Sequence, residues 1–539
     1  MSPHVMDTGM LRKIVIHNYR LFRDFTLEFT PGMNILVGDN DTGKSTVLEA
    51  VNLALTGRVQ NRLLAQDLSP YLFNLDITRE YILAVQEGQG PEPPDMIVDL
   101  YLEQSAATAH LKGRNNSTDE DTYGLRFRAA YNPDFAVEYA AFIKEPDNIR
   151  VVPAEYYRCE WMGFDGNAVT ARSIPVTVSV IDAAAIRLQS GADYYLQGII
   201  GNNLTPTERV ELTRAYRSLR EEFARNPSIT EINNKLKATP GDVSDRELSL
   251  GIDISQRASW ESSLVPHLDD MPFTFVGKGE QSSLKILLAL NRRVQDAHVV
   301  LVEEPENHLS FTRMNILIGK VLKKCEDRQV LVTTHSSYVL NKLGLKQLVL
   351  LTDTGGLRLS GLTPSTQDYF QKLPGYDTLR LILAQRAILV EGPSDELIVQ
   401  RAYRDIHGAL PIYEGVDVIS TGLSFRRFLE LAVQLQRRTT VVRDNDGSDP
   451  AEVAARYADF TVHNFISVRV GAAEGGNTLE PQLLAANGRA ALNEIFGTSY
   501  VTDEDLVKHM TSNKTTCALA IFESETTITM PGYIRDAVA

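Results

Sequence analysis

Short apolar runs and turns alternate at the start of the chain. Residues Lys13–Tyr19, Phe25–Phe29 and Asn34–Val37 are apolar or alternate between apolar and polar residues, which is the pattern of strands. A Gly-rich turn and a helical pattern follow the third run. This order predicts the opening of an α/β domain. Residues 87–95 concentrate Gly, Pro and acidic residues and predict a surface loop inserted between sheet strands.

The pattern becomes helical at Thr205. We expect Thr205 to be the N-cap, with Pro206 at the first helical position and Glu208 completing a capping box. Apolar residues then recur at helical spacing as far as about Leu236. The prediction is a helical arm at about residues 195–245, and the sequence leaves open whether it is a packed subdomain or a dimerisation insert.

A second α/β series is predicted near the C-terminus. Strand-like and helix-like segments alternate from about Val276 to Leu351, and the polar residues 352–367 interrupt them. The apolar strand Ala387–Val390 then begins a new series. We therefore expect two α/β domains, at residues 1–380 and 381–539.

The composition of the chain excludes several classes of protein. A chain of 539 residues, 43% apolar, can bury at least two cores. The net charge of −15 excludes a polycation that coats nucleic acid, so any DNA surface must be a local basic patch. Three widely spaced cysteines exclude a disulfide framework or a structural zinc site. No membrane span or signal peptide is evident, and we expect a cytoplasmic protein.

A phosphate-binding loop lies between the third strand and the first helix. Residues 38–46 fit the pattern G-x-x-x-x-G-K-[ST] in the context that this motif requires. Backbone N–H groups would surround the phosphates of ATP, Lys44 would neutralise their charge, and Ser45 would bind Mg²⁺. The candidate nucleotide-binding residues are Asn40, Gly43, Lys44, Ser45 and Thr46.

Two later strands deliver polar side chains at their ends. The apolar strand Val299–Val302 leads into Glu303, which suits the Mg²⁺ shell, and Glu304, which suits orienting the attacking water. An acidic turn after a core strand is the alternative. The strand Gln329–Val332 leads to His335.

This order of P-loop, paired acids and strand-end histidine resembles ABC-type ATPases of the SMC and RecF kind. The resemblance implies that His335 senses the γ-phosphate and that two heads enclose ATP. Residues 277–281 stand where the signature segment belongs, ahead of a predicted helix Ser282–Leu290, but they lack its usual serine. Lys278 and Gln281 are the candidate residues there. Residues 18–22 resemble the segment near the adenine.

Carboxylates also follow two strands of the second domain. Glu391 ends the first strand, and Asp395 lies at the start of the next helix, where it suits either a hard cation or the helix dipole. The strand Thr439–Val442 precedes Asp444 and Asp446, which suit Mg²⁺ or a simple DNDG turn.

This arrangement resembles the Toprim fold. Joined behind an ABC-type ATPase, it resembles the OLD (overcoming lysogenisation defect) endonuclease family, which includes the Gabija nuclease subunit and retron-associated nucleases. Glu480 and Lys514 match two further family positions, although a helix-start carboxylate and a solvated lysine are the alternatives. The family implies two Mg²⁺ or Mn²⁺ ions and a lysine that offsets charge on the phosphorus. The implied metal ligands are Glu391, Asp395, Asp444, Asp446 and Glu480.

The resemblance implies an ATP-binding, Mg²⁺-dependent DNA endonuclease that acts in anti-phage defence. It implies at least a homodimer, with a helicase-like protein or a reverse transcriptase and its noncoding RNA as candidate partners. The alternatives are an SMC/RecF-like DNA clamp with a non-catalytic Toprim scaffold, and a strand-joining or priming enzyme. Whether ATP restrains or drives cleavage stays open.

Overall fold

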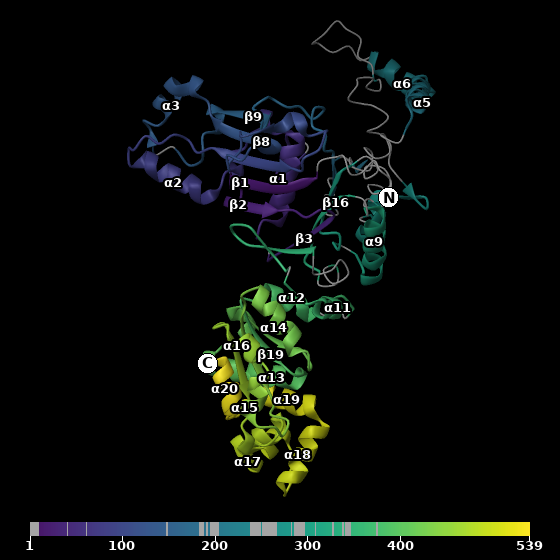
Figure 1. Cartoon of the computed structure of the whole chain (residues 1–539). Helices are drawn as coiled ribbons and strands as arrows, with labels where there is room; N and C mark the ends of the chain where they lie inside the picture. Colours follow the sequence, from purple (N-terminus) through teal and green to yellow (C-terminus); the bar gives the residue numbers. More distant parts are fainter. Residues whose placement is uncertain are drawn as a thin grey trace. The chain divides into compact units, whose positions relative to one another are not determined.

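The structure is a computed structural model of the chain (Figure 1). It describes residues 10–539 apart from 40, 61, 147–148, 183–187, 190–191, 194–203, 238–249, 251–266, 282, 285–296, 308, 326–327, 337–338, 340–346, 360 and 373–375. The chain divides into two compact units. One comprises Met1–Val176 with Gln329–Ala539, and the other comprises Thr177–Arg328.

An antiparallel sheet begins the first unit, in the order β2-β1-β6-β8-β7, with β9 also paired to β8. Its strands confirm the first two predicted runs, with slightly different ends. The predicted loop at 87–95 is confirmed, but it joins the helix α2 to the strand β6 and does not directly connect two strands. The elements are β1 (Leu11–Tyr19), β2 (Phe22–Glu28), β6 (Met96–Leu102), β7 (Lys112–Gly113), β8 (Thr122–Tyr131), β9 (Tyr157–Gly163), α2 (Leu75–Gln86) and α3 (Ala136–Phe142).

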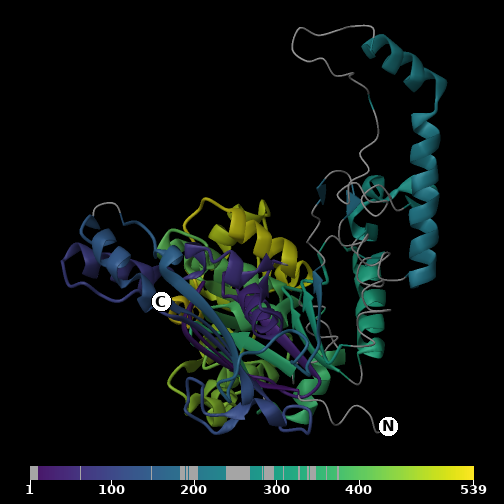
Figure 2. The same ribbon diagram turned by 90° about the horizontal axis from the view of Figure 1, so that it is seen from above.

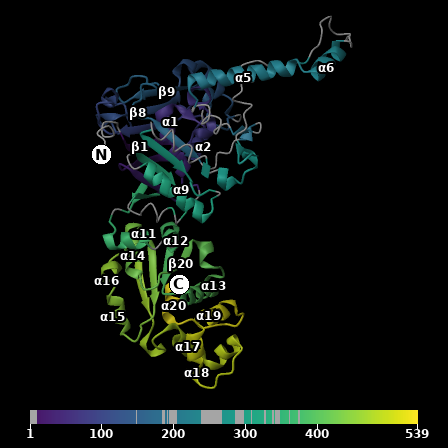
Figure 3. The ribbon, with the colours of Figure 1, turned by 90° about the vertical axis from the view of Figure 1, so that its right-hand side faces the viewer.

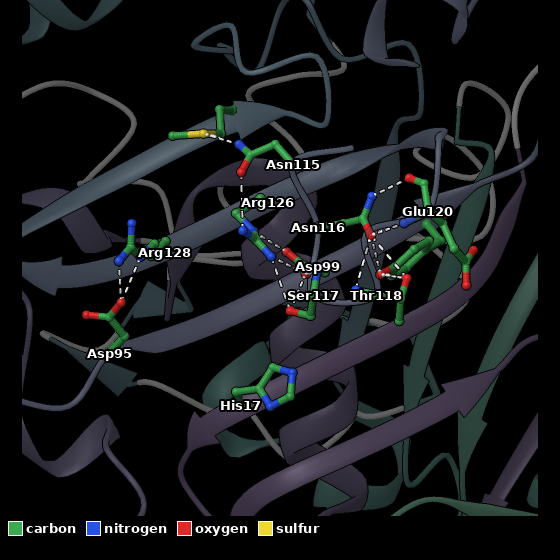
Figure 4. A network of polar contacts seen from close by, with 12 residues as sticks. His17, Asp95, Asp99, Asn115, Asn116, Ser117, Thr118, Glu120, Arg126 and Arg128 are labelled. Carbon is green, nitrogen blue, oxygen red and sulfur yellow. Dashed lines mark hydrogen bonds and ion pairs between the residues drawn. The ribbon is translucent and has the colours of Figure 1, made fainter. Parts of the chain in front are cut away.

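A buried ion pair fixes the connection between β6 and β8 (Figure 4). Asp99 is fully buried, and Arg126 donates to it through Nε and Nη2, both at 2.7 Å. The backbone N–H and the hydroxyl of Ser117 also donate to Asp99, each at 2.6 Å. Because a buried carboxylate needs several donors, this pairing holds the loop that contains Ser117 against the sheet.

The P-loop strand belongs to a second sheet. Within the first unit, β3 (Met33–Val37) lies between β16 (Gln329–Thr333) and β17 (Leu348–Leu351), parallel to both. The polar stretch at 352–367, expected only to interrupt the pattern, forms β18 (Gly356–Arg358), antiparallel to β17, and the start of α11 (Pro364–Lys372). Helix α1 (Lys44–Thr56) packs against β6, β8 and β16.

The second unit contains β15 (Val299–Glu303), parallel to β10 (Val178–Asp182), and α9 (Phe311–Lys324). The predicted capping box at Thr205 is confirmed. The segment predicted as a helical arm contains two helices, α5 (Pro206–Ala224) and α6 (Pro227–Lys237), which lie at an angle to each other (Figure 2). No residue of α5 is buried. The unit also has two short hairpins, β11 (Leu188–Gln189) with β12 (Ala192–Asp193) and β13 (His267–Leu268) with β14 (Met271–Pro272).

The C-terminal residues form a four-stranded parallel sheet, in the order β20-β19-β21-β22. Helices α12, α14, α15 and α16 cover one face, and α13, α19 and α20 cover the other (Figure 3). The strands are β19 (Arg386–Val390), β20 (Val416–Ser420), β21 (Arg438–Arg443) and β22 (Ile466–Val470). The helices are α12 (Tyr376–Leu383), α13 (Pro393–His407), α14 (Phe425–Gln434), α15 (Pro450–Ala455), α16 (Ala458–Thr461), α17 (Leu479–Phe496), α18 (Asp503–Ser512), α19 (Lys514–Glu523) and α20 (Gly532–Val538).

The α/β class predicted for both halves of the chain is therefore confirmed. Strands at 386–390 and 438–443 contain the predicted apolar runs. In the part of the chain that the structure describes, no helix combines the length and hydropathy of a membrane span.

Candidate nucleotide and metal sites

The P-loop is shaped by Gly43, the N-cap of α1. Its φ of 87° is in the left-handed region, and an added Cβ would lie 2.3 Å from Cζ of Phe22. Both facts require glycine at this position. Lys44 is buried and donates from Nζ to the carbonyls of Gly38, at 2.9 Å, and Asp39, at 2.6 Å. The first turn of α1 carries no acidic residue, so its N-terminus suits an anion.

The other predicted residues of the P-loop differ in exposure. Ser45 is exposed at the start of α1, whereas Thr46 is buried. Asn40 lies outside the described residues. His335 follows β16, whose neighbour in the sheet is β3, and the backbone N–H of Thr334 donates to the carbonyl of Leu36. The P-loop and His335 therefore lie at the same edge of the sheet, because both follow the carboxyl ends of neighbouring parallel strands.

The segment predicted to lie near the adenine is tied to α1. Arg20 donates to both carboxylate oxygens of Glu49, at 2.6 and 2.9 Å, and the Tyr19 hydroxyl donates to the same group. Asn18 is buried and donates to the carbonyl of Asp95. Burial and the charge of Glu49 raise the pKa of Tyr19. These contacts fix the turn between β1 and β2 beside the P-loop helix.

The paired acids belong to the second unit. Glu303 is the last residue of β15 and is half-buried. Glu304 has a φ of 39°, and its carboxylate accepts a hydrogen bond of 2.7 Å from the amide of Asn307. The left-handed backbone turns the chain directly after the strand.

The predicted signature segment differs from expectation in one respect. Residues 278–281 are already helical, so the segment forms the first turn of a helix and does not precede it. Lys278 is exposed. Gln281 is 5% exposed and donates its amide to the carbonyls of Phe273, at 2.9 Å, and Val276, at 2.7 Å. Gln281 thus closes the preceding turn, and its contact with a nucleotide stays a prediction.

In the C-terminal sheet, Glu391 and Asp444 follow neighbouring parallel strands. Strand β19 pairs with β21, with Leu389 opposite Val441, so both carboxylates emerge at one edge. Asp395 lies in the first turn of α13 and accepts a hydrogen bond of 3.1 Å from the N–H of Gly392. Burial raises the pKa of Glu391 and of Asp395. The loop and helix between the strands therefore bring three acids together.

Asp444 is held at both oxygens. Its Oδ1 accepts a hydrogen bond of 3.1 Å from the hydroxyl of Tyr533, and its Oδ2 accepts one of 3.0 Å from the N–H of Leu479. Burial, followed by the charges of Asp395 and Glu391, raises the pKa of Asp444 to about 7. Negative charge is thus concentrated around this buried carboxylate.

Asp446 and Arg443 pair beside it. Arg443 Nη2 lies 2.7 Å from Oδ2 of Asp446 and 3.5 Å from Oε1 of Glu391. That Glu391 oxygen is buried and accepts no hydrogen bond. Asn445 is 1% exposed and donates its amide to three backbone carbonyls, at Gly471, Ala472 and Gly476. These contacts shape the loop so that the side chains of Asp444 and Asp446 take different partners.

Glu480 and Lys514 form the other side of the cluster. Glu480 is buried in the first turn of α17, and Lys514 is the first residue of α19, with its Nζ 3.1 Å from Oε1 of Glu480. The hydroxyl of Thr478 donates to Oε2 of Glu480 at 2.8 Å. Burial acts to lower the pKa of Lys514, but Glu480, Asp395 and Asp444 outweigh it and raise that pKa. Lys514 is therefore a protonated amine facing the acids.

The side chains of the cluster are chemically suited to bind a divalent ion, but they do not surround a common metal position in this structure. Carboxylate oxygens are the ligands that hard divalent cations prefer, and Oε1 of Glu391 is a buried oxygen without a donor. Among the described residues, however, no three acidic, histidine or cysteine side chains are arranged to hold a metal ion. In the structure Asp446 pairs with Arg443, Glu480 pairs with Lys514, and Asp444 accepts a hydrogen bond from Tyr533.

Arg443 and Tyr533 were missed by the sequence analysis. Arg443 is adjacent to Asp444, and its place at the end of a buried strand was a usable signal. Tyr533 lies 89 positions from Asp444, in α20, and no local pattern pointed to it.

Three family models match the chain. An "AAA domain" matches residues 13–116, and an "AAA domain, putative AbiEii toxin, Type IV TA system" matches residues 191–341. An "Overcoming lysogenization defect protein-like, TOPRIM domain" matches residues 382–446. The last range contains Glu391, Asp395, Asp444 and Asp446 but ends before Glu480 and Lys514.

Individual relatives match either a short part of the chain at higher identity or a longer part at lower identity. A DNA replication and repair protein RecF of Gloeobacter violaceus is 45% identical over 58 residues, which is 11% of this chain and 16% of that protein. An ATP/GTP phosphatase of Helicobacter pylori is 21% identical over 350 residues, 61% of this chain and 85% of that protein. The solved C-terminal region of the Burkholderia pseudomallei OLD protein is 20% identical, with a TM-score of 0.25, over 29% of this chain and 96% of its own.

The nucleotide site at the start of the chain lies in the stretch that matches an AAA domain, and the acidic cluster lies largely in the stretch that matches a TOPRIM domain. The chain therefore combines AAA-type ATPase domains with a TOPRIM domain of the overcoming-lysogenization-defect type.

Proposed function

We propose that this chain is a DNA endonuclease that depends on Mg²⁺ or Mn²⁺ and whose cleavage is controlled by ATP. The observation that carries the proposal is the convergence of Glu391, Asp395 and Asp444 at one edge of the TOPRIM sheet, close enough for burial and mutual repulsion to raise the pKa of Asp444 to about 7. Such a concentration of carboxylates is costly unless a cation offsets it.

The chain's residues have distinct proposed roles. A bound divalent ion would activate a water molecule and offset the charge of the scissile phosphate. Glu391, Asp395, Asp444, Asp446 and Glu480 are the proposed ligands of one or two such ions. Lys514 would place its ammonium against the phosphate as negative charge develops there. Leu479 N–H and the Tyr533 hydroxyl orient Asp444.

At the ATPase, Lys44 and the N–H groups of α1 would bind the phosphates of ATP, and Ser45 and Glu303 would hold Mg²⁺. Glu304 would orient water, and His335 would contact the γ-phosphate. Lys278 and Gln281 would face ATP bound to a second head, so the proposal includes a homodimer or a larger homo-oligomer. A place in anti-phage defence is supported by the resemblance to the OLD family.

The test is cleavage of supercoiled plasmid and linear duplex DNA by the full chain. Mg²⁺ or Mn²⁺ should be compared with EDTA, each with and without ATP. We expect cleavage only with a divalent ion. An absence of cleavage under every condition, with ATP hydrolysis intact, would favour the DNA-clamp alternative.

Lys44→Ala tests the link between the two domains. We expect the variant to lose ATP binding, because the buried ammonium of Lys44 is the main positive charge of the loop. Its cleavage rates with and without ATP should then coincide. If wild-type cleavage is faster with ATP than the variant's, ATP drives cutting, and if it is slower, ATP restrains it. A variant that still responds to ATP would contradict the proposed coupling.

Tyr533→Phe tests the positioning of Asp444. The change removes one hydroxyl from a buried ring and leaves Oδ1 of Asp444 without its donor. Because groups that orient a metal ligand typically contribute about 10–100-fold in metal affinity, we expect half-maximal cleavage to require about tenfold more Mg²⁺. The maximal rate at saturating Mg²⁺ should change little.

Tyr403→Phe is the matched control, since Tyr403 is also buried in this domain and donates to a carboxylate, Glu414, at 2.6 Å. It should leave the Mg²⁺ requirement unchanged. If both variants changed the Mg²⁺ requirement equally, the hydroxyl of Tyr533 would act only through the stability of the folded domain.

A further inference from the structure

Arg443 is a cation built into the acidic cluster. It is the last residue of β21, and its side chain is 9% exposed. Its Nη2 lies 2.7 Å from Asp446 Oδ2 and 3.5 Å from Glu391 Oε1. One guanidinium nitrogen therefore lies against two of the carboxylates that are proposed to bind a divalent ion.

The other two guanidinium nitrogens of Arg443 also donate hydrogen bonds. Nη1 donates to the hydroxyl of Tyr457 at 3.0 Å, and Nε donates to the backbone carbonyl of Asp444 at 3.2 Å. The ring of Phe425 lies 5.9 Å from the guanidinium carbon. Because a planar guanidinium with fixed partners loses little further freedom, Arg443 is a stable part of the site and not a mobile surface charge.

This placement has an electrostatic consequence. The charge of Arg443 lies within ion-pair distance of carboxylate oxygens of both Glu391 and Asp446. The guanidinium thus supplies to Glu391 and Asp446 the positive charge that a divalent ion would supply. A hard cation and a guanidinium both seek carboxylate oxygens, so they compete for them.

We propose that Arg443 is an internal counter-cation that competes with the divalent ion for Glu391 and Asp446 and so sets the ion concentration at which the TOPRIM site fills. The inference rests on the proposed function, because it assumes that these carboxylates bind metal. Glu391 and Asp446 share one cation in the structure, the guanidinium of Arg443.

The test is Mn²⁺ binding to the full chain, measured by calorimetry without nucleotide or DNA. Arg443→Met keeps the length of the side chain and removes its charge. We expect Mn²⁺ to bind about tenfold more tightly than to wild type, which is the size of effect that one charge within ~4–6 Å has on proton binding. A purely structural role predicts the opposite sign, because a collapsed loop would lose affinity.

Three further variants test whether the change in Mn²⁺ affinity comes from Arg443 and from the TOPRIM site. Arg426→Met removes a half-exposed arginine of the same domain that pairs with Asp459, and it should leave Mn²⁺ affinity unchanged. Asp444→Asn should abolish the binding, which places the measured site in the TOPRIM domain. Tyr457→Phe removes one of the contacts that hold Arg443 and should tighten Mn²⁺ binding by about two- to threefold, within the usual range for one hydrogen bond.

The outcomes are distinct. Tighter binding by Arg443→Met supports the proposal, and if that variant does not fold, tighter binding by Tyr457→Phe does so. Equal or weaker binding by the folded variants overturns the competition while leaving the metal site intact. If wild type and variants all fail to bind Mn²⁺, the metal site of the proposed function is overturned together with this inference.

Discussion

Replacing Asp444 with asparagine is expected to lower metal-dependent DNA cleavage by about 10³-fold. Loss of a metal ion removes several kcal/mol of transition-state stabilisation, and each ~1.4 kcal/mol is tenfold in rate. Asparagine has nearly the same shape and keeps an oxygen that can accept from the N–H of Leu479. The measurement is the initial rate of plasmid cleavage at saturating Mg²⁺ or Mn²⁺.

The fold of this variant should survive. Burial and repulsion raise the pKa of Asp444, so its ionised form destabilises the folded domain relative to a neutral group. The unfolding temperature without metal should therefore not fall. Asp459→Asn is the matched control, because Asp459 is exposed and pairs at the surface with Arg426. Its cleavage should equal that of wild type. Retained cleavage by Asp444→Asn would remove the TOPRIM site from the mechanism.

Residues that end buried strands were the most predictable part of the site. Glu391 and Asp444 were expected to be metal ligands that follow apolar strands, and the parallel pairing of β19 with β21 brings them to one edge of the sheet. The same reasoning placed His335 at the edge of the P-loop strand. Strand periodicity and a following turn are local signals, so the sequence carries them directly.

The partners of those residues were less predictable. Tyr533 and Leu479 reach Asp444 from α20 and α17, and this follows from tertiary packing that no local pattern encodes. The contact of the Gln281 amide with the turn at Phe273–Phe275 was likewise not expected from the sequence. The break between α5 and α6 was different, because Pro227 removes a backbone donor and begins the second helix, which the sequence could have revealed.

Lys514 depends on a distant residue for its position, which leads to the second large expected effect. It begins α19, and Arg401 of α13 holds the other end of that helix. Arg401 is 4% exposed and donates from Nη1 to the carbonyls of Ile521, at 2.7 Å, and Ser524, at 2.5 Å. Its Nε donates to both oxygens of Asp405, at 2.7 and 2.9 Å. One buried side chain thus satisfies several acceptors at the end of α19.

Arg401→Met is expected to destabilise the TOPRIM domain by about 4 kcal/mol, because removing one partner of a buried, hydrogen-bonded charge typically costs ~3–5 kcal/mol. For a domain of this size, that is a fall of about 10 °C in its unfolding temperature. Calorimetry of the full chain measures the fall. Amide hydrogen exchange should show a loss of protection in residues 514–523. The same local unfolding would weaken the contact of Lys514 with Glu480.

Arg404→Met provides the graded comparison on the same helix. Arg404 is less buried and donates to one carbonyl of α19, that of Phe522, at 2.7 Å. Its loss should cost only about 1 kcal/mol, the usual net value of a single hydrogen bond. An equal fall in the unfolding temperature of the two variants would contradict the prediction that the contacts of Arg401 anchor α19. A larger fall for Arg401→Met, with faster exchange confined to α19, would show that α13 positions Lys514 through the far end of its helix.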